Sequence, residues 1–279
     1  LPHHKSPPRF IPARAFALVA SSIAWTHDVA HTHFPDHPPL AAAKILACGA
    51  MTNSDFFDRR LVATGDGSHS LYLPACNEHY HSSHGALRES QHIFIGCGYD
   101  EMAVNAGGRM RILEVGFGTG LNALLTWERC DQGSSAVEYV AIEAFPVTVE
   151  LASQLNYASC LASPAAQEIF AAMHQCSWGI WGHLGENFSL LKLQTRIEDF
   201  EPVDPYDLVY FDAFSPPIQP ELWTRIIFDK LYRCMRPGAV LVTYCAKGAV
   251  KRNLRAVGFA IENPPGPPGK REITRATKR

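Results

Sequence analysis

A glycine-rich segment between a strand-like stretch and a helix-like stretch constrains the fold more than any other feature of this sequence. Residues 111–115 are expected to form a strand and residues 121–130 a helix, and Gly116, Gly118 and Gly120 alternate between them. Glycines let the backbone turn tightly and approach a nucleotide-like ligand without clashes from Cβ atoms. The segment therefore predicts a ligand-binding loop at the end of a buried strand.

The repeated order of strand, loop and helix after this segment predicts the fold class. Short apolar runs that read as strands are separated by longer helical patterns, which is typical of a parallel sheet with helices on both faces. We therefore expect an α/β, Rossmann-like, doubly wound and mostly parallel sheet. The expected strands are residues 138–143, 190–193, 208–211, 239–244, 259–261 and 273–276, and the expected helices are residues 221–235 and 249–257.

The residues before the glycine-rich loop divide into two parts. Residues 1–54 are rich in Pro, His and Ala and lack an amphipathic period, so we expect a disordered extension there. An Asp-Gly pair between two apolar runs is a hairpin signal, and Gly65-Asp66-Gly67 has this setting. We expect residues 55–105 to form a small β-hairpin and a lid over the cofactor, and residues 106–279 to form the Rossmann-like domain.

Acidic and aromatic side chains stand at the ends of the expected strands. Glu143 ends the strand after the loop, where an acidic side chain accepts hydrogen bonds from ribose hydroxyls. Asp212 follows the strand at 208–211 and is the best candidate to meet an amine, and Phe214 offers a π-face to a base or a cation. Glu114 is expected to orient an amino acid group through the loop amides. The plainer alternatives are a surface Glu, a loop-capping Asp and a core Phe.

Cysteine and histidine patterns, together with hydropathy, exclude several classes of protein. The eight cysteines form no C-x-x-C pair, which is typical of reduced thiols in a cytoplasmic protein. His79, His81 and His84 lie close together, but no clear further ligand accompanies them, so we expect no metal site. The sequence has no run of about 18 apolar residues, so we expect no membrane partner.

The C-terminal end of the chain is strongly basic. The last 33 residues carry nine Lys and Arg against Glu262 and Glu272, a charge of +7, whereas the net charge of the whole chain is only -2. Such asymmetry suits an anionic partner such as nucleic acid. Basic chain ends are also often plain solvated surface, so the charge alone does not decide between the two.

Several motifs, in order along the chain, together resemble one enzyme family. From about residue 56 to the end, the chain resembles the MnmC-like tRNA methyltransferase family. The motifs are Asn-Glu-His-Tyr-His-Ser at 77–82, Gly-Ala-Leu-Arg-Glu-Ser at 85–90, Glu-Val-Gly-Phe-Gly-Thr-Gly-Leu-Asn at 114–122, Phe-Asp-Ala-Phe-Ser-Pro at 211–216, Pro-Glu-Leu-Trp at 220–223 and Gly-Pro-Pro-Gly-Lys-Arg-Glu at 266–272. As a set, these motifs are more specific than the glycine-rich loop alone.

The resemblance implies a class I methyltransferase fold with a C-terminal antiparallel strand, S-adenosyl-L-methionine as the cofactor and tRNA as the partner. It implies methylation of the aminomethyl group of a wobble uridine, which gives 5-methylaminomethyluridine. Bifunctional members carry a flavin-dependent oxidoreductase domain after the methyltransferase. The resemblance does not include that domain, so we expect a stand-alone methyltransferase.

The resemblance also implies roles for individual residues. Asp212 and Phe214 are expected at the reacting amine. Either Glu198 or Asp199 is expected to meet the adenine amino group, and the sequence leaves both open. The other residues expected at the cofactor are Glu114, Gly116, Phe117, Gly118, Gly120, Asn122 and Glu143. The residues expected to meet tRNA phosphates are Lys247, Lys251, Arg252, Lys270 and Arg271.

Other functions remain open at this point. An aminopropyltransferase of the spermidine synthase type shares the sheet and has an Asp after the corresponding strand, and a methyltransferase acting on another amine would share the loop. A nucleic-acid-binding module without a reaction is a third alternative. Phe214, the segment 220–223 and the basic end of the chain favour the tRNA enzyme, and Glu143 and Asp212 argue against a module without a reaction.

Overall fold

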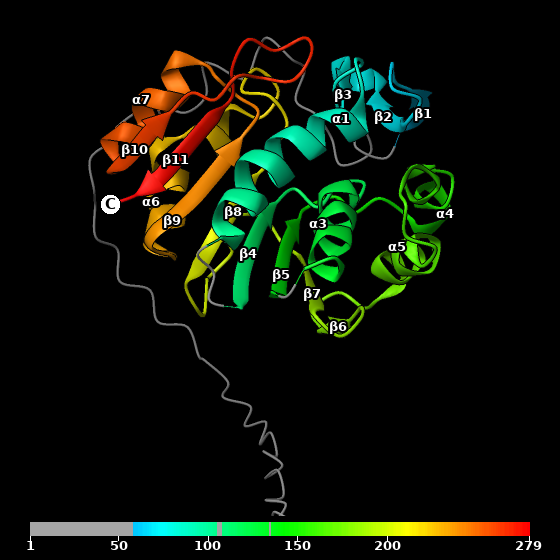
Figure 1. Cartoon of the computed structure of the whole chain (residues 1–279). Helices are drawn as coiled ribbons and strands as arrows, with labels where there is room; N and C mark the ends of the chain where they lie inside the picture. Colours follow the sequence, from blue (N-terminus) through cyan, green and yellow to red (C-terminus); the bar gives the residue numbers. More distant parts are fainter. Residues whose placement is uncertain (1–57, 105–107, 134) are drawn as a thin grey trace, which may run out of the picture. The chain divides into compact units, whose positions relative to one another are not determined.

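An eight-stranded sheet lies at the centre of the residues that the computed structural model describes, which are 58–104, 108–133 and 135–279. The strand order is β10-β11-β9-β8-β4-β5-β7-β6 (Figure 1), with the bounds β4 (Arg109–Val115), β5 (Ala136–Glu143), β6 (Gly182–His183), β7 (Phe188–Gln194), β8 (Tyr206–Phe211), β9 (Met235–Thr243), β10 (Phe259–Glu262) and β11 (Thr274–Lys278). The expected disordered extension at 1–54 falls outside the described residues.

Neighbouring strands in the middle of this sheet run parallel, and β11 runs against them. β4 pairs in parallel with β5 and β8, β5 pairs in parallel with β7, and β8 pairs in parallel with β9. β11 is antiparallel to both β9 and β10, and the short β6 is antiparallel to β7. These directions confirm the expected α/β fold with a mostly parallel sheet and a C-terminal antiparallel strand.

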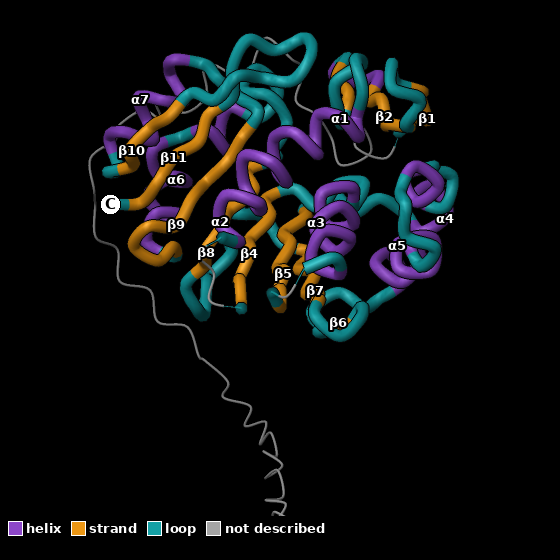
Figure 2. Tube along the Cα trace, viewed as in Figure 1, coloured by secondary structure: helices purple, strands orange, loops and turns teal. Residues whose placement is uncertain are grey.

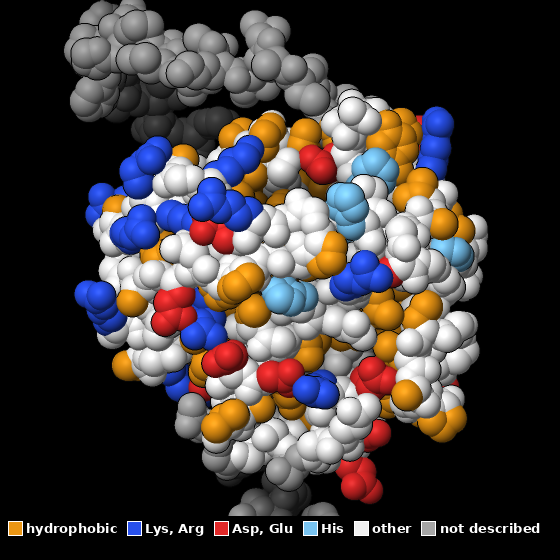
Figure 3. Space-filling view, turned by 45° about the horizontal axis from the view of Figure 1, so that its top comes forward, with side chains coloured by type: hydrophobic (Ala, Val, Ile, Leu, Met, Phe, Trp, Pro, Cys, Tyr) orange, Lys and Arg blue, Asp and Glu red, His pale blue; other side chains and the backbone are white. Residues whose placement is uncertain are grey.

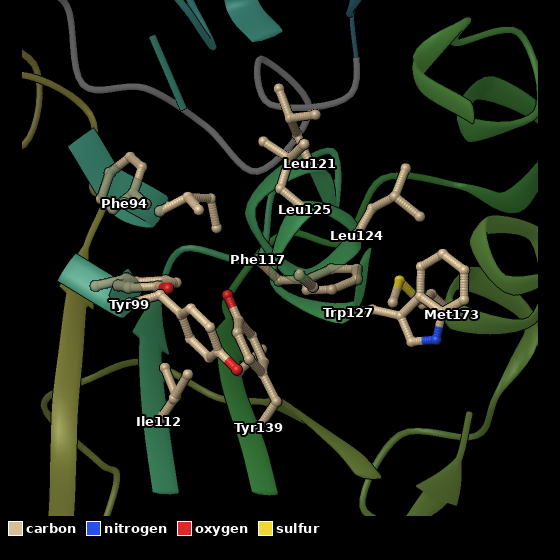
Figure 4. Close-up of a cluster of buried hydrophobic side chains, with 14 of the residues drawn as sticks. Phe94, Tyr99, Ile112, Phe117, Leu121, Leu124, Leu125, Trp127, Tyr139 and Met173 are labelled. Atoms are coloured by element: carbon tan, nitrogen blue, oxygen red, sulfur yellow. The ribbon is translucent and has the colours of Figure 1, made fainter. Parts of the chain in front are cut away.

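Helices cover both faces of the sheet (Figure 2). They are α1 (Ala86–Ser90), η3 (Gln91–Asp100), α2 (Glu101–Ala103), α3 (Leu121–Asp131), α4 (Val149–Ala152), η4 (Tyr157–Cys160), α5 (Ala166–Gln175), η5 (Pro220–Trp223), α6 (Arg225–Arg233) and α7 (Gly248–Ala256). Successive side chains of a strand point to opposite faces, so Ile112 packs in a core cluster with η3, α3 and α5 (Figure 4), and Leu113 packs in another with α6 and α7.

A small three-stranded sheet precedes the main one in the chain. It is formed by β1 (Arg60–Ala63), β2 (His69–Leu73) and β3 (Glu78–His79), and a short turn, η2 (Pro74–Cys76), lies between the last two strands. Asp66 in the β1–β2 turn accepts hydrogen bonds from the backbone N–H of Ser68 at 3.0 Å and of Arg88 at 2.9 Å. The hairpin is thereby tied to α1, which carries Glu89.

One local expectation was incomplete and another was wrong. The region expected to be a hairpin and a lid also contains a continuous helical stretch from α1 through η3 to α2, and η3 has the wide i→i+5 turn of a π-helix. The helix expected over residues 221–235 ends earlier, because α6 ends at Arg233 and the segment Arg236-Pro237-Gly238 lies inside β9. Gly238 takes a φ of +80°, and the register of β9 against β8 shifts there.

Candidate active site

A cavity of about 210 Å³ opens where β4, β5 and β8 end. Parallel α/β sheets bind ligands at the carboxyl ends of their strands, so the position suits a cofactor site. The cavity brings together nine residues that the sequence predicted for the site: Gly116, Phe117, Gly118, Asn122, Glu143, Glu198, Asp212, Phe214 and Lys270. It does not include the predicted residues Glu114, Gly120, Asp199, Lys247, Lys251, Arg252 and Arg271.

The glycine-rich loop has a backbone that only glycine adopts easily. Gly116 has a φ of +94°, and a Cβ there would lie 2.7 Å from the carbonyl oxygen of Asp212. Gly118 has a φ of +51°, and its N–H donates to Glu143 Oε2 at 2.9 Å. The loop between β4 and α3 is therefore held against the end of β8 on one side and against the side chain that ends β5 on the other.

The aromatic side chain of the loop is directed into the core. Phe117 is buried among the core side chains (Figure 4). Its ring centre lies 5.5 Å from that of His174 and 6.2 Å from that of Trp178. The residue still belongs to the cavity wall, but the ring belongs to the core cluster on the α3 and α5 side of the sheet. We therefore expect its contribution to a cofactor site to come from loop geometry.

A side-chain amide joins a buried and a half-buried carboxyl group beside the loop. Asn122 Nδ2 donates to Glu114 Oε1 and to Asp212 Oδ2, each at 2.9 Å. Burial and, to a smaller extent, the nearby Glu89 carboxyl raise the pKa of Asp212 to about 7. Burial also raises the pKa of Glu114 well above its ordinary value. Near pH 7, Asp212 therefore exchanges a proton easily.

The part of the cavity near Asp212 is formed by residues that are far apart in the chain. The rings of Tyr80 and Phe214 meet edge to face with 5.0 Å between their centres. Lys270 Nζ lies 4.6 Å from the centre of the Tyr244 ring and 3.1 Å from Glu89 Oε1. Lys270 therefore lies in the cavity wall, paired with a buried carboxylate.

Sequence reasoning missed Glu89, Tyr80 and Tyr244 as site residues. Glu89 and Tyr80 lie in two of the quoted motifs, so the signal was present, but nothing local in the chain indicates that both face the end of β8. Glu89 Oε2 accepts a hydrogen bond from the backbone N–H of Ser82 at 2.7 Å. Tyr244 donates its hydroxyl proton to the carbonyl oxygen of Ala213 at 2.8 Å.

One of the residues predicted to meet phosphate is unsuited to that role. Lys251 is 7% exposed, and its Nζ lies 2.7 Å from Glu272 Oε1, so its ammonium group has no free side for a phosphate. Lys247, Arg252 and Arg271 are exposed. Figure 3 shows Lys and Arg side chains gathered at the left of the face, the side on which α7 and β10 lie in Figure 1.

The groups around the cavity fit a nucleoside-like cofactor. Glu143 presents a carboxylate at the end of β5, the position from which an acidic side chain accepts hydrogen bonds from ribose. Glu198 lines the cavity and the exposed Asp199 does not, so Glu198 is the better placed of the two for an adenine. Asn122 Oδ1 is buried and has no hydrogen-bond partner among the described residues, which leaves an acceptor for a ligand.

Comparison with known proteins shows the family of the chain. A family model described as S-adenosyl-L-methionine-dependent methyltransferase matches residues 187–279. The curated protein "tRNA 5-methylaminomethyl-2-thiouridine biosynthesis bifunctional protein MnmC" of Cupriavidus necator is 34% identical over 216 residues, which are 75% of this chain and 33% of that protein. Its counterpart in Ectopseudomonas mendocina is 33% identical over 207 residues, which are 70% of this chain and 31% of that protein.

A solved structure agrees with these matches. The crystal structure of MNMC2 from Aquifex aeolicus superposes with a TM-score of 0.65 at 27% identity and covers 79% of this chain and 70% of that one. The chain spans about a third of the length of the curated relatives that it matches. No helix among the described residues is both long enough and apolar enough to cross a membrane. The chain belongs to the S-adenosyl-L-methionine-dependent methyltransferases and is of the MnmC type.

Proposed function

We propose that the chain transfers a methyl group from S-adenosyl-L-methionine to the aminomethyl group of a wobble uridine in tRNA, giving 5-methylaminomethyluridine. The observation that carries the proposal is the half-buried Asp212 carboxyl in the cavity wall, whose pKa of about 7 suits the handling of an amine proton. The names of the curated relatives, which refer to 5-methylaminomethyl-2-thiouridine biosynthesis in tRNA, support the choice of substrate.

Asp212 acts on the amine before methyl transfer. A primary amine has a pKa of about 10.4 and is mostly protonated at neutral pH, so it must lose a proton to become a nucleophile. Asp212 holds the ammonium form by charge and accepts the proton, and Asn122 fixes the accepting carboxyl through its 2.9 Å hydrogen bond. When bound, S-adenosyl-L-methionine supplies an electrophilic methyl group to the amine. The rigid placement of Asp212 supplies much of the acceleration.

The remaining cavity residues hold the two ligands. Glu143 accepts hydrogen bonds from the ribose, and Glu198 faces the adenine. Phe214 and Tyr80 offer ring surfaces for the uracil, since single-stranded bases in tRNA are recognised by stacking on aromatic side chains. Trp223 Nε1 donates to the backbone carbonyl oxygen of Phe214 at 2.8 Å, so the backbone that carries this ring is fixed by η5.

The test is mass spectrometry of wobble nucleosides. Undermodified tRNA that carries 5-aminomethyluridine is incubated with the protein and S-adenosyl-L-methionine, and we expect a gain of one methyl group on that nucleoside. The Asp212→Ala variant is the control and should give no product while retaining cofactor binding in calorimetry. A parallel reaction with putrescine and decarboxylated S-adenosylmethionine tests the aminopropyltransferase alternative. Product in that reaction, with unmodified tRNA in the first, would refute the proposal.

A further inference from the structure

A second group of side chains contacts the glycine-rich loop from outside the cavity. His174 on α5 and Lys192 on β7 are both buried, and neither lines the cavity. His174 Nε2 lies 3.1 Å from the carbonyl oxygen of Thr119. Because a carbonyl oxygen only accepts hydrogen bonds, Nε2 carries the proton and donates it. The centre of the loop is thereby bonded to the last turn of α5.

The contact between His174 and the loop is tight on both sides of Thr119. A Cβ at Gly120 would lie 3.0 Å from His174 Nε2 and 3.1 Å from Phe117 Cζ. The Phe117 ring in turn packs against the imidazole. No room remains for the imidazole to move toward the loop, so a change in its position must change the path of the loop backbone.

Lys192 completes this group as a buried cation. Lys192 is 1% exposed, and no carboxylate among the described residues forms an ion pair with it. Its Nζ donates to the carbonyl oxygen of His174 at 3.0 Å and lies 4.8 Å from the ring centre of Trp178 and 5.6 Å from that of Phe117. Lys192 therefore contacts both His174 and the loop residue Phe117.

The fold alone does not account for a lysine at this position. A buried charge without an acidic partner is destabilising, and an apolar side chain of similar length would pack there more favourably. Burial lowers the pKa of Lys192, and burial lowers the pKa of His174 to about 4, so His174 is neutral near pH 7. The ammonium group orients its neighbours, because it donates a hydrogen bond to the His174 carbonyl oxygen and attracts the face of the Phe117 ring.

We propose that His174 and Lys192 are positioning residues that hold the glycine-rich loop in its ligand-binding conformation and so determine the affinity for S-adenosyl-L-methionine without touching it. The proposal rests on the assignment of the loop to this cofactor and is independent of the tRNA substrate. Its test is therefore cofactor binding by calorimetry, and failure of the tRNA reaction leaves that measurement intact.

The first variants separate the hydrogen bond from the packing. His174→Leu keeps the volume but removes the donor, and we expect the Kd for S-adenosyl-L-methionine to rise about tenfold, the effect of one lost hydrogen bond. His174→Gln keeps a donor of similar reach and should restore most of the affinity. His183→Leu is the matched control, because His183 is exposed and bonds to Ser189, away from the loop.

The second variants separate affinity from stability. Lys192→Met should raise the Kd by about threefold or more, as expected for a lost cation–π contact, while the midpoint of urea unfolding stays the same or rises. Lys278→Met is the matched control, because Lys278 also donates to backbone carbonyl oxygens and lies 4.7 Å from the centre of an aromatic ring, that of Tyr232, but has no contact with the loop.

Two outcomes would overturn the proposal. One is an unchanged Kd in both His174→Leu and Lys192→Met. The other is a loss of affinity that follows the loss of stability and that His174→Gln does not restore, since this is the behaviour of an ordinary core contact. At saturating cofactor, kcat should stay near the wild-type value in Lys192→Met while KM for S-adenosyl-L-methionine rises, because the role is in binding.

Discussion

Asn122 Nδ2 donates a hydrogen bond of 2.9 Å to Asp212 Oδ2. The first turn of α3 is thereby bonded to the carboxyl group that directly follows β8. The same nitrogen donates to the buried Glu114, whose pKa is raised by burial. Both N–H groups of the Asn122 amide thus donate to carboxyl groups. Of the two acids, only Asp212 also lines the cavity, which makes it the group to vary first.

Asp212→Asn should abolish methyl transfer and stabilise the protein. The carboxyl has an ordinary pKa of 3.8 and a pKa of about 7 in the folded protein, so its ionisation opposes folding as pH rises from the first value to the second. At about 1.36 kcal/mol per tenfold change in proton affinity, the free energy of unfolding at alkaline pH should increase by roughly 4 kcal/mol. Urea unfolding at acid and alkaline pH measures this. Equal stability of both proteins at alkaline pH would contradict the raised pKa.

The pH profile of methyl transfer should follow the ionisation of Asp212. The rate should rise through about pH 7, since the carboxylate is the form that accepts a proton. Lys270 lowers the pKa of Asp212 and Glu89 raises it, so Lys270→Met should move the inflection to higher pH and Glu89→Gln to lower pH. The measurement is kcat/KM for tRNA across a pH series. Shifts of both variants in the same direction would exclude this electrostatic origin.

Gly116→Ala should weaken cofactor binding strongly. The new Cβ would lie 2.7 Å from the carbonyl oxygen of Asp212 at a φ of +94°, so the loop must move away from β8. Gly67→Ala is the matched control, because Gly67 has a similar φ of +84° and no atom within 4 Å of the added Cβ. Both variants should lose about 1 kcal/mol or more of unfolding free energy, but calorimetry should detect weaker S-adenosyl-L-methionine binding in Gly116→Ala alone.

The parts of the site that could be predicted from the sequence are those fixed by local pattern. The glycine-rich loop, Glu143 and Asp212 each follow directly after a buried strand, and parallel strands bring their carboxyl ends to one edge of a sheet. To predict that these residues meet in one cavity, only the order of the strands in the sheet had to be known in addition. The same local reasoning gave the hairpin at Asp66 and the helix that begins at Leu121.

The parts that could not be predicted depend on contacts between distant segments. The partner of Lys270 is Glu89, which reaches the cavity because α1 is held by the β1–β2 turn, and no local pattern encodes that contact. The helical stretch through Gly96 and Gly98 was missed because glycine disfavours helices, yet a Cβ at Gly98 would lie 3.1 Å from Val242, so the sheet demands a small residue there.

Lys251 shows that the positions of basic residues in the sequence do not reveal which of them can bind phosphate. It lies beside Val250 and one helical turn before Leu254, both buried, on the face of α7 that packs against the sheet. A count of basic residues treats it as equal to its neighbour Arg252, which is exposed. The burial of Lys251 and its ion pair with Glu272 distinguish it from a lysine that is free to bind phosphate.

Replacing Lys247, Arg252 and Arg271 together by Gln should weaken tRNA binding and leave cofactor binding unchanged. Each phosphate contact releases counterions, so the slope of log Kd against log salt should fall by roughly 2 to 3 if all three side chains bind phosphate. Binding of labelled tRNA across a salt series measures the slope.

The matched control replaces three exposed arginines near the amino ends of the strands, the edge opposite the cavity: Arg109, Arg129 and Arg233. It removes the same charge from the protein, so a general electrostatic effect would weaken tRNA binding equally in both triple variants. We expect the slope of log Kd against log salt to fall only in the variant that lacks Lys247, Arg252 and Arg271. Equal losses in the two would show that net charge, and not the surface around α7, governs the encounter with tRNA.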